Sequence, residues 1–204
     1  VAQIVWIDLL LSGDNAVVIA LACRSLPEKQ RKLGVLIGTA GAILLRVVLI
    51  LFAASLMKWP YLKIVGGLLL LWIGIKLIAP QEEHGKEISA NDNLIAAVRT
   101  IIIADFVMSL DNVIGIAGAA HGNVTLIVLG LLISIPIIIF GSSVIMKAMD
   151  RFPVIITIGA GLLGYVAGEM AVTDNAVATW IEQKAHYLHI WLPILGAVFV
   201  VIVG

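Results

Sequence analysis

Charged residues are scarce in this sequence, and cysteine is almost absent. Charged residues make up 13% of the 204 residues, against ~25% in soluble domains. The single cysteine, Cys23, excludes an internal disulfide and any zinc site built from several thiolates. The formal net charge is zero, so the composition indicates no nucleic-acid partner.

Motifs of nucleotide-driven and catalytic chemistry are missing as well. The sequence holds no Gly-x-x-x-x-Gly-Lys phosphate loop, so ATP-driven work by this chain is not supported. It also holds no nucleophile elbow and no His-Glu-x-x-His pattern. We therefore expect no enzyme and no resident cofactor, and any transport would draw on an ion gradient.

Apolar residues are abundant instead. They make up 61% of the chain, and the mean hydropathy is +1.12. Because a helix needs ~20 apolar residues to cross the hydrocarbon core of a bilayer, the apolar runs predict seven spans, at 4–22, 33–57, 61–78, 94–118, 124–147, 153–168 and 188–204. We expect an all-α membrane protein with about seven transmembrane helices, forming one domain over residues 1–204 in the lipid bilayer.

One polar segment occurs twice within these spans. Residues 8–20 return as residues 105–117, and every matching pair is 97 positions apart, as 8 and 105 are. A weaker echo, at an interval of 93, relates Gly66-Gly67 to Gly159-Ala160. These intervals predict two repeats of three spans, at about 1–80 and 94–168, with an extra helix at 188–204. Each copy of the segment contains two aspartates, a serine and an asparagine: Asp8, Ser12, Asp14 and Asn15, then Asp105, Ser109, Asp111 and Asn112.

The distribution of Lys and Arg predicts the orientation of the spans. Counted from the N-terminus, the odd-numbered connections between predicted spans contain nine of these residues, and the even-numbered connections contain three. Connections rich in Lys and Arg stay in the cytoplasm. We therefore expect a multi-pass protein of the cell membrane with its N-terminus outside and the loop at 80–93 in the cytoplasm. The two copies of the polar segment, on the first and fourth spans, would then run in opposite directions, as in an inverted-topology repeat.

The polar residues of each copy follow helical spacing. At ~100° per residue, Asp8, Ser12 and Asn15 share an arc of about 60°, whereas Asp14 lies about 120° away from Asp8. A break in the first helix at Gly13 would give Asp14 access to the same site, as in the discontinuous helices of transporters. The second copy has Leu110 at that place, so a break is less expected there.

The two polar stripes would face each other across a pseudo-two-fold axis and offer carboxylate, amide and hydroxyl oxygens. Such ligands suit Mg²⁺, Ca²⁺ and Mn²⁺, and the lack of intramembrane Cys and His argues against Zn²⁺ and Cu⁺. A charged side chain at the bilayer centre costs roughly 2.5 kcal/mol or more, so four aspartates indicate a pathway for a divalent cation. Two alternatives stay open, because Ser and Asn can join helices and aspartates can relay protons without metal.

Arg46 is the one Lys or Arg that lies deep within a predicted span. We expect it to face the bundle and pair with an aspartate, which would offset part of the buried negative charge; snorkelling to an interface is the alternative. Glu169 and Asp174 follow the sixth span, where a solvated loop is favoured over an exit vestibule for a cation. His186 and His189 are interpreted as loop or interface residues on the outer side.

The paired Asp-x-x-x-Ser-x-Asp-Asn segments, the seven spans and their inverted arrangement resemble the TerC family of integral membrane proteins over essentially the whole chain. The endings Ser-Gly-Asp-Asn-Ala-Val-Val and Ser-Leu-Asp-Asn-Val resemble its short YjbE-like branch. The resemblance implies export of Mn²⁺ from the cytoplasm, membership of the wider LysE-type exporter group, and metal-associated roles for Asp8, Asp14, Asp105 and Asp111. The choice of Mn²⁺ over Ca²⁺ comes from the resemblance alone.

Three functions therefore stand side by side at this stage. The first is a secondary transporter that exports divalent cations, Mn²⁺ above all, in exchange for protons. The second is a membrane partner that delivers metal to secreted proteins, and the third is an exchanger of Ca²⁺ or another cation for protons. The sequence is compatible with a homo-oligomer.

Overall fold

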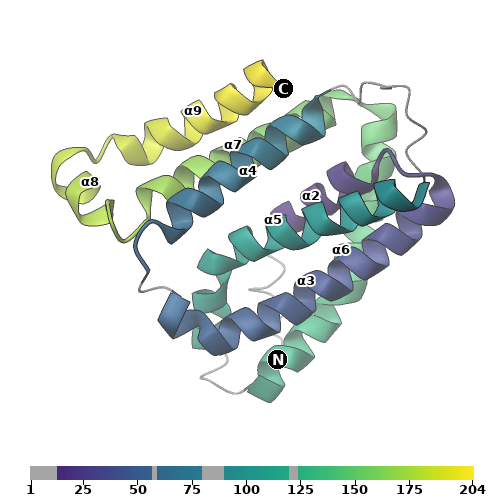
Figure 1. Ribbon diagram of the computed structural model, residues 1–204, viewed down its shortest axis with the longest axis horizontal. Helices are drawn as coiled ribbons and strands as arrows, with labels where there is room; N and C mark the ends of the chain where they lie inside the picture. The colour runs from purple at the N-terminus through teal and green to yellow at the C-terminus, as the bar shows by residue number, and fades with distance from the viewer. Residues whose placement is uncertain (1–12, 57–58, 80–89, 120–123) are drawn as a thin grey trace.

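The computed structural model describes residues 13–56, 59–79, 90–119 and 124–204, and these residues form helices without a strand. The all-α fold expected from the sequence is thereby confirmed. In chain order the helices are α2 (Gly13–Cys23), α3 (Glu28–Leu56), α4 (Leu62–Ile78), α5 (Ala90–Ala119), α6 (Val124–Arg151), α7 (Val154–Val172), α8 (Ala178–Lys184) and α9 (Leu188–Val203) (Figure 1).

Four of these helices are long and apolar enough to cross a membrane, namely α3, α5, α6 and α7. A fifth span results if α8 and α9, which meet at a bend of 115°, are taken together. Large apolar side chains are exposed on the outer faces, with Leu44 at 71%, Phe140 at 72% and Ile202 at 76%. Apolar surface on this scale requires a lipid or protein partner, so the chain is a multi-pass membrane protein.

The expected number of seven spans is not confirmed. Each predicted span overlaps a helix, but the 17 residues of α4 would reach only about 26 Å at 1.5 Å per residue, and the hydrocarbon core is ~30 Å thick. The described part of the first span, α2, has 11 residues. The rest of the predicted span at 4–22 lies outside the described residues.

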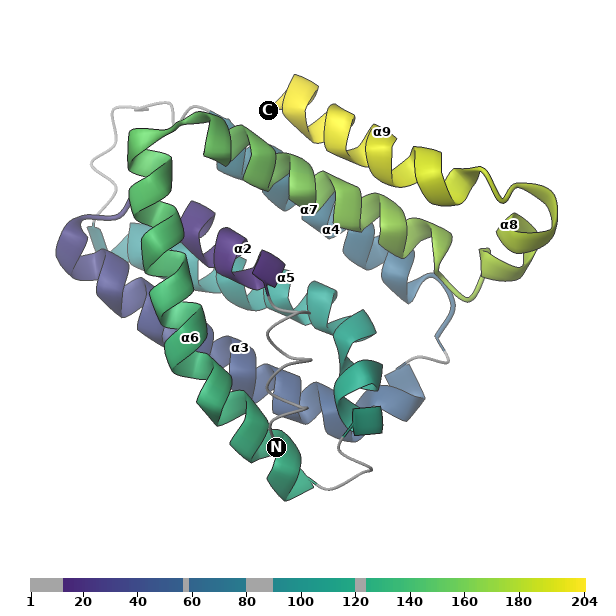
Figure 2. The same cartoon turned by 180° about the vertical axis from the view of Figure 1, so that it is seen from behind.

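The helices form two sets of three that pack in the same way. The first set is α2, α3 and α4, and the second set is α5, α6 and α7. The second helix of each set packs on the first helix of the other set, α3 on α5 and α6 on α2. The third helix does the same, α4 on α5 and α7 on α2. Figure 1 shows that the equivalent helices of the two sets run in opposite directions, and Figure 2 shows α2 beside α5 and α6 from behind. This arrangement is what an inverted repeat requires.

The buried faces of α3 and α6 give the register between the two sets. The buried positions 34, 35, 38, 42 and 46 of α3 correspond to 130, 131, 134, 138 and 142 of α6, each 96 positions later. The interval is 97 in the polar segments and 93 between α4 and α7, so it shortens along the chain. In this register the counterpart of Arg46 is Ser142.

Glycines allow close approach between the two sets. A Cβ on Gly66 of α4 would lie 2.8 Å from Val107 of α5, and one on Gly159 of α7 would lie 2.7 Å from Val17 of α2. These two glycines are the residues paired by the sequence echo. Small residues at helix contacts are typical of packing in membranes, where the bilayer supplies little hydrophobic drive for association.

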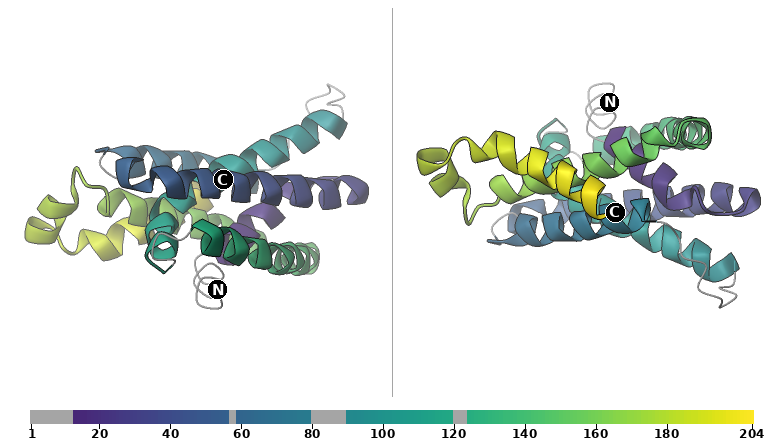
Figure 3. Two further views of the ribbon diagram at one scale, coloured as in Figure 1. Left: turned by 90° about the horizontal axis from the view of Figure 1, so that it is seen from below. Right: turned by 90° about the horizontal axis from the view of Figure 1, so that it is seen from above.

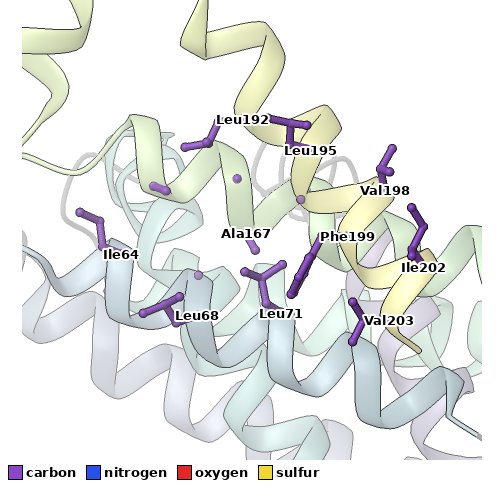
Figure 4. Close-up of a pocket in the computed structure, with 14 residues that line it drawn as sticks. Ile64, Leu68, Leu71, Ala167, Leu192, Leu195, Val198, Phe199, Ile202 and Val203 are labelled. Carbon is purple, nitrogen blue, oxygen red and sulfur yellow. The ribbon is translucent and has the colours of Figure 1, made fainter.

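The extra helix α9 packs on α7 and α4. The contact of α9 with α7 is backbone to backbone, since a Cβ on Gly164 would lie 2.2 Å from the carbonyl oxygen of Gly196. An apolar groove of about 580 Å³ lies between α4, α7 and α9, lined by side chains that include Leu71, Ala167 and Phe199 (Figure 4). The groove has no polar side chain in its lining, so it offers no ligand to a cation.

Candidate functional site

A buried ion pair connects α3 to the second polar segment. The guanidinium of Arg46 donates from Nη2 to Oδ1 of Asp105 and from Nε to Oγ of Ser109, the latter at 3.0 Å. Ser109 in turn donates to Oδ2 of Asp105 at 3.2 Å. Arg46 is 2% exposed and Asp105 is 6% exposed. The expected pairing of Arg46 with an aspartate is therefore present, and its partner is Asp105.

The spacing of the second segment explains how α5 presents these groups. Asp105, Ser109 and Asn112 lie at positions i, i+4 and i+7, which share one face of a helix. All three are buried, so the polar stripe expected from the sequence faces the inside of the bundle. The helix α5 is continuous from Ala90 to Ala119, and the second segment is therefore unbroken.

Residues of the first segment approach the same place from α2. Asp14 is partly buried, and its Oδ1 accepts a hydrogen bond from the backbone N–H of Asn15 at 2.8 Å. Asp14 also lies close enough to Arg46 and Asp105 to interact with both charges. Because α2 packs on α5, a carboxylate from each copy lies within electrostatic range of the Arg46 guanidinium, as an inverted repeat predicts.

Two buried polar side chains, one on α2 and one on α3, lack hydrogen-bond partners among the described residues. Asn15 is 4% exposed, and neither its amide oxygen nor its amide nitrogen has a hydrogen bond. The hydroxyl of Thr39, which is 2% exposed, likewise makes no hydrogen bond among the described residues. Thr39 lies two turns before Arg46 on the buried face of α3. Buried polar atoms of this kind normally have a partner, so both side chains keep hydrogen-bonding capacity for a ligand.

Several predicted site residues cannot be placed. Asp8 and Ser12 lie outside the described residues, and so does the side chain of Asp111. The structure joins Arg46, Asp105 and Ser109 by hydrogen bonds between α3 and α5. Asn112 is buried one turn further along the same face of α5, and Asp14 and Asn15 come from α2, which packs on α5. These residues supply carboxylate, amide and hydroxyl oxygens, which are the ligands that hard divalent cations prefer.

Asp174 is not in a solvated loop, and the expectation from the sequence is wrong at this point. It is 1% exposed and accepts hydrogen bonds from the backbone N–H groups of Tyr61 at 2.9 Å, Lys63 at 3.0 Å, Ile64 at 3.3 Å and Ala176 at 2.8 Å. Burial alone would raise the pKa of Asp174, but these four donors outweigh it and lower the pKa. Asp174 therefore caps α4 from a distant part of the chain.

The need for such a cap can be seen at the start of α4. Tyr61 has a positive φ of 65° and its side chain makes no capping hydrogen bond, so the first N–H groups of α4 require an acceptor from elsewhere. Asp174 supplies it. Glu169, by contrast, is exposed on α7, and the two acidic residues do not form one vestibule.

Arg24 and Arg31, at the end of the bundle opposite to Asp174, both bind other groups of the protein. Arg24 donates from Nη2 to the carbonyl oxygen of Leu77 at 2.9 Å, at the C-terminal end of α4, where a cation is favourable. Arg31 forms an ion pair with Asp150 at 3.1 Å. The connection between α2 and α3 is thus tied to the ends of α4 and α6.

Comparison with known proteins decides the family. A family model with the description "Integral membrane protein TerC family" matches residues 1–204. The chain belongs to the TerC family. Within it, the chain is 44% identical to the "Uncharacterized membrane protein YjbE" of Bacillus subtilis (strain 168), over 98% of this chain and 90% of that protein. The TerC match agrees with the resemblance expected from the doubled aspartate segment.

More distant relatives include the "Uncharacterized membrane protein YceF" of the same organism, 29% identical over 84% of this chain and 70% of that protein. A "UPF0053 protein" of Haemophilus influenzae is 26% identical over 72% of this chain and 70% of its own length. No solved structure matches the chain. The TerC family consists of integral membrane proteins, which is consistent with a role in membrane transport.

Proposed function

We propose that this TerC protein is a secondary transporter that exports divalent cations, with Mn²⁺ as its main cargo, through the site between α2 and α5. The observation that carries the proposal is the buried ion pair of Arg46 and Asp105, which lies within electrostatic range of Asp14 from the other repeat. Two carboxylates and one guanidinium in a buried place form a site in which an incoming cation can replace the guanidinium as the partner of Asp105.

The unpartnered oxygens extend this support. Asn15 offers a buried amide oxygen next to Asp14, and Thr39 offers a buried hydroxyl on the face of α3 that leads toward the basic end of the bundle. The basic end is the cytoplasmic one by the positive-inside rule. Thr39 then marks the side from which the cation enters. The oxygen shell of the bound cation is completed by the amides of Asn15 and Asn112 and the hydroxyls of Ser12 and Ser109.

The proposed cycle alternates between two partners for Asp105. When a cation binds Asp14 and Asp105, Arg46 withdraws, and when the cation leaves, Arg46 returns and offsets the buried charge. The exchange of equivalent helices in an inverted repeat would open the site first to one side of the membrane and then to the other. Protons taken up by the aspartates on release would couple export to the proton gradient.

Transport by the purified protein in liposomes tests the proposal. Vesicles with the wild-type chain should accumulate radioactive Mn²⁺ without any partner protein, and an imposed pH gradient should change the rate. Asp105→Asn should remove uptake, and Glu169→Gln, which changes an exposed carboxylate, should not. Uptake that needs the secretion machinery would instead indicate delivery of metal to secreted proteins. If Ca²⁺ inhibits Mn²⁺ uptake more strongly than Mg²⁺ or Zn²⁺ does, and is itself taken up in preference to Mn²⁺, the protein is instead a Ca²⁺ exchanger.

Cysteine labelling in intact cells tests the proposed orientation. Cys23 is the single native thiol and is buried, so it is shielded from the reagent, and a Cys23→Ala background removes it altogether. A cysteine at Gln81 should react only with a reagent that reaches the cytoplasm, and one at Asn123 should react from outside. Reaction of both positions from the same side would contradict the inverted arrangement in the membrane.

A further inference from the structure

Three potential metal ligands meet where α8 joins α9, far from the buried ion pair in sequence. Oε1 of Glu182 lies 4.0 Å from Nδ1 of His186, and its Oε2 lies 3.5 Å from Nε2 of His189. One ligand atom from each residue falls within 4.8 Å of the other two. The histidine rings lie with their centroids 5.3 Å apart and are tilted by 47° relative to each other.

The chain geometry at this place holds the three residues together. The helix α8 ends at Lys184 and α9 begins at Leu188, and the bend of 115° between them brings Glu182 back to the first turn of α9. Backbone hydrogen bonds fix the short connection, including one from the N–H of Leu188 to the carbonyl of Ala185 at 2.8 Å. Figure 3 shows α8 and this bend at one extremity of the molecule in both views.

The distances are close to those of a metal site. Bonds of about 2.0–2.2 Å to nitrogen and oxygen in a tetrahedral site place neighbouring ligand atoms roughly 3.3–3.6 Å apart. The 3.5 Å between Nε2 of His189 and Oε2 of Glu182 already agrees with this. The 4.0 Å between Nδ1 of His186 and Oε1, and the 4.8 Å within which one ligand atom of each residue falls, must shorten by rotation of the exposed side chains. Glu182 and His186 are exposed and free to move, with side chains 68% and 75% exposed.

Nε2 of His189 is the second observation that points to a ligand. It is buried and makes no hydrogen bond among the described residues, although it is directed at the carboxylate of Glu182. A nitrogen in this position can give its lone pair to a metal bound by the same carboxylate. Two imidazoles with one carboxylate suit Zn²⁺ and similar cations, and the fourth position stays open for water.

We propose that Glu182, His186 and His189 form a binding site for a divalent transition metal that favours imidazole, such as Zn²⁺ or Co²⁺. The site differs in ligand type from the all-oxygen cluster around Asp105, and it does not depend on the proposed export of Mn²⁺. By the expected orientation it lies on the outer face of the membrane.

Cobalt binding to the purified full-length chain, with its affinity tag removed, tests the site. Co²⁺ bound to imidazole and carboxylate in a tetrahedral site absorbs visible light, so titration in detergent should show these bands. The double variant His186→Gln with His189→Gln should lose them, and Glu182→Gln should weaken Co²⁺ binding by about tenfold or more. Gln183→Ala, at an exposed neighbour on α8, is the matched control and should bind Co²⁺ like the wild type.

A calorimetric titration with Zn²⁺ separates this site from the one between α2 and α5. Asp105→Asn should keep the Zn²⁺ equivalent that the double histidine variant loses, and the double histidine variant should still transport Mn²⁺. Size-exclusion chromatography will show whether each variant is folded. If the wild type and the double histidine variant bind the same number of Co²⁺ and Zn²⁺ ions, the proposed site does not exist, whatever the outcome for Mn²⁺ export.

Discussion

Asp105 and Asp174 are both nearly inaccessible, at 6% and 1% exposed, yet their charges are balanced in different ways. Asp105 is balanced by side chains, the guanidinium of Arg46 and the hydroxyl of Ser109. Asp174 is balanced by four backbone N–H groups, three of them at the start of α4. The first set of donors can rotate away, and the second is fixed by the fold.

This difference separates a site from a cap. Backbone donors at a helix terminus cannot leave without unfolding the first turn, so the carboxylate of Asp174 is not available to a passing cation. A guanidinium on a flexible stem can withdraw when another cation takes its place. Burial of an aspartate is therefore weak evidence for transport, and the mobility of its partner is the better indicator.

The largest expected effect is that of Asp105→Asn on the affinity for Mn²⁺. Loss of a charged ligand should weaken Mn²⁺ binding by more than about a hundredfold, since removal of outer partners of bound metals already costs roughly tenfold to a hundredfold. Asp174→Asn should leave the affinity of the folded protein unchanged. A binding isotherm for Mn²⁺ in detergent measures both. Equal losses in the two variants would remove the distinction between site and cap.

Asp14→Asn extends the same test to the other repeat. If Asp14 and Asp105 share one cation, either substitution should remove most Mn²⁺ transport, and the double variant should be little worse than each single one, because residues that act together are not additive. Independent, multiplying losses in liposome uptake would show that the two carboxylates serve separate sites.

The second effect concerns Arg46→Gln, which leaves Asp105 buried without its cation. Removing one partner of a buried ion pair typically costs 3–5 kcal/mol, so the melting temperature in detergent should fall clearly. Saturating Mn²⁺ should restore much of the loss, since a ligand at about 100 times its Kd adds about 2.7 kcal/mol. Mg²⁺ at the same concentration is the control for ionic strength. A loss of stability that Mn²⁺ leaves untouched would mean that no cation replaces the guanidinium.

The third effect concerns the cap. Asp174→Ala should lower stability by roughly 1–3 kcal/mol, from the lost cap and the unpaired N–H groups, and Mn²⁺ should not restore it. The pKa of Asp174 is lowered in the folded state, so its stabilising effect is present above the ordinary aspartate value of about 3.9 and is lost as the pH falls through the folded-state value. The melting temperatures of wild type and variant should therefore converge only below about pH 4. A difference that closes between pH 5 and pH 7 would contradict this account.

Helices and the polar stripe can be predicted from this sequence because both depend on local spacing. The span predicted at 61–78 is α4 at Leu62–Ile78, and that at 188–204 is α9 at Leu188–Val203. The stripe on α5 follows from intervals of four and three residues. The pairing of Arg46 with an aspartate can also be expected, since an unpaired charge in a span is costly.

Contacts between distant parts of the chain are beyond reach of the sequence alone. Nothing in the spacing shows which aspartate meets Arg46, or that Asp174 meets the N–H of Tyr61, 113 positions away. The bend between α8 and α9 depends on a short connection without Pro or Gly between Lys184 and Leu188. The spacing Glu182-x-x-x-His186-x-x-His189 was the available signal for the ligands at that bend, and it lacks a pattern specific enough to predict them.

The smallest expected effect tests whether charge balance is the same in both repeats. The counterpart of Arg46 on α6 is Ser142, which is fully buried and donates to the carbonyl of Ile139 at 3.0 Å. Ser142→Ala removes one neutral hydrogen bond within its own helix, so stability should change by less than about 1 kcal/mol and Mn²⁺ uptake should stay at the wild-type rate. Arg46→Ser, which gives both repeats the same residue type, should behave like Arg46→Gln. If Ser142→Ala stops uptake while the protein stays folded, the hydroxyl belongs to the cation pathway, and the two repeats contribute from α3 and α6 alike. If it does not, the hydroxyl of Ser142 serves packing within α6, and the single guanidinium of Arg46 serves the aspartates of both repeats.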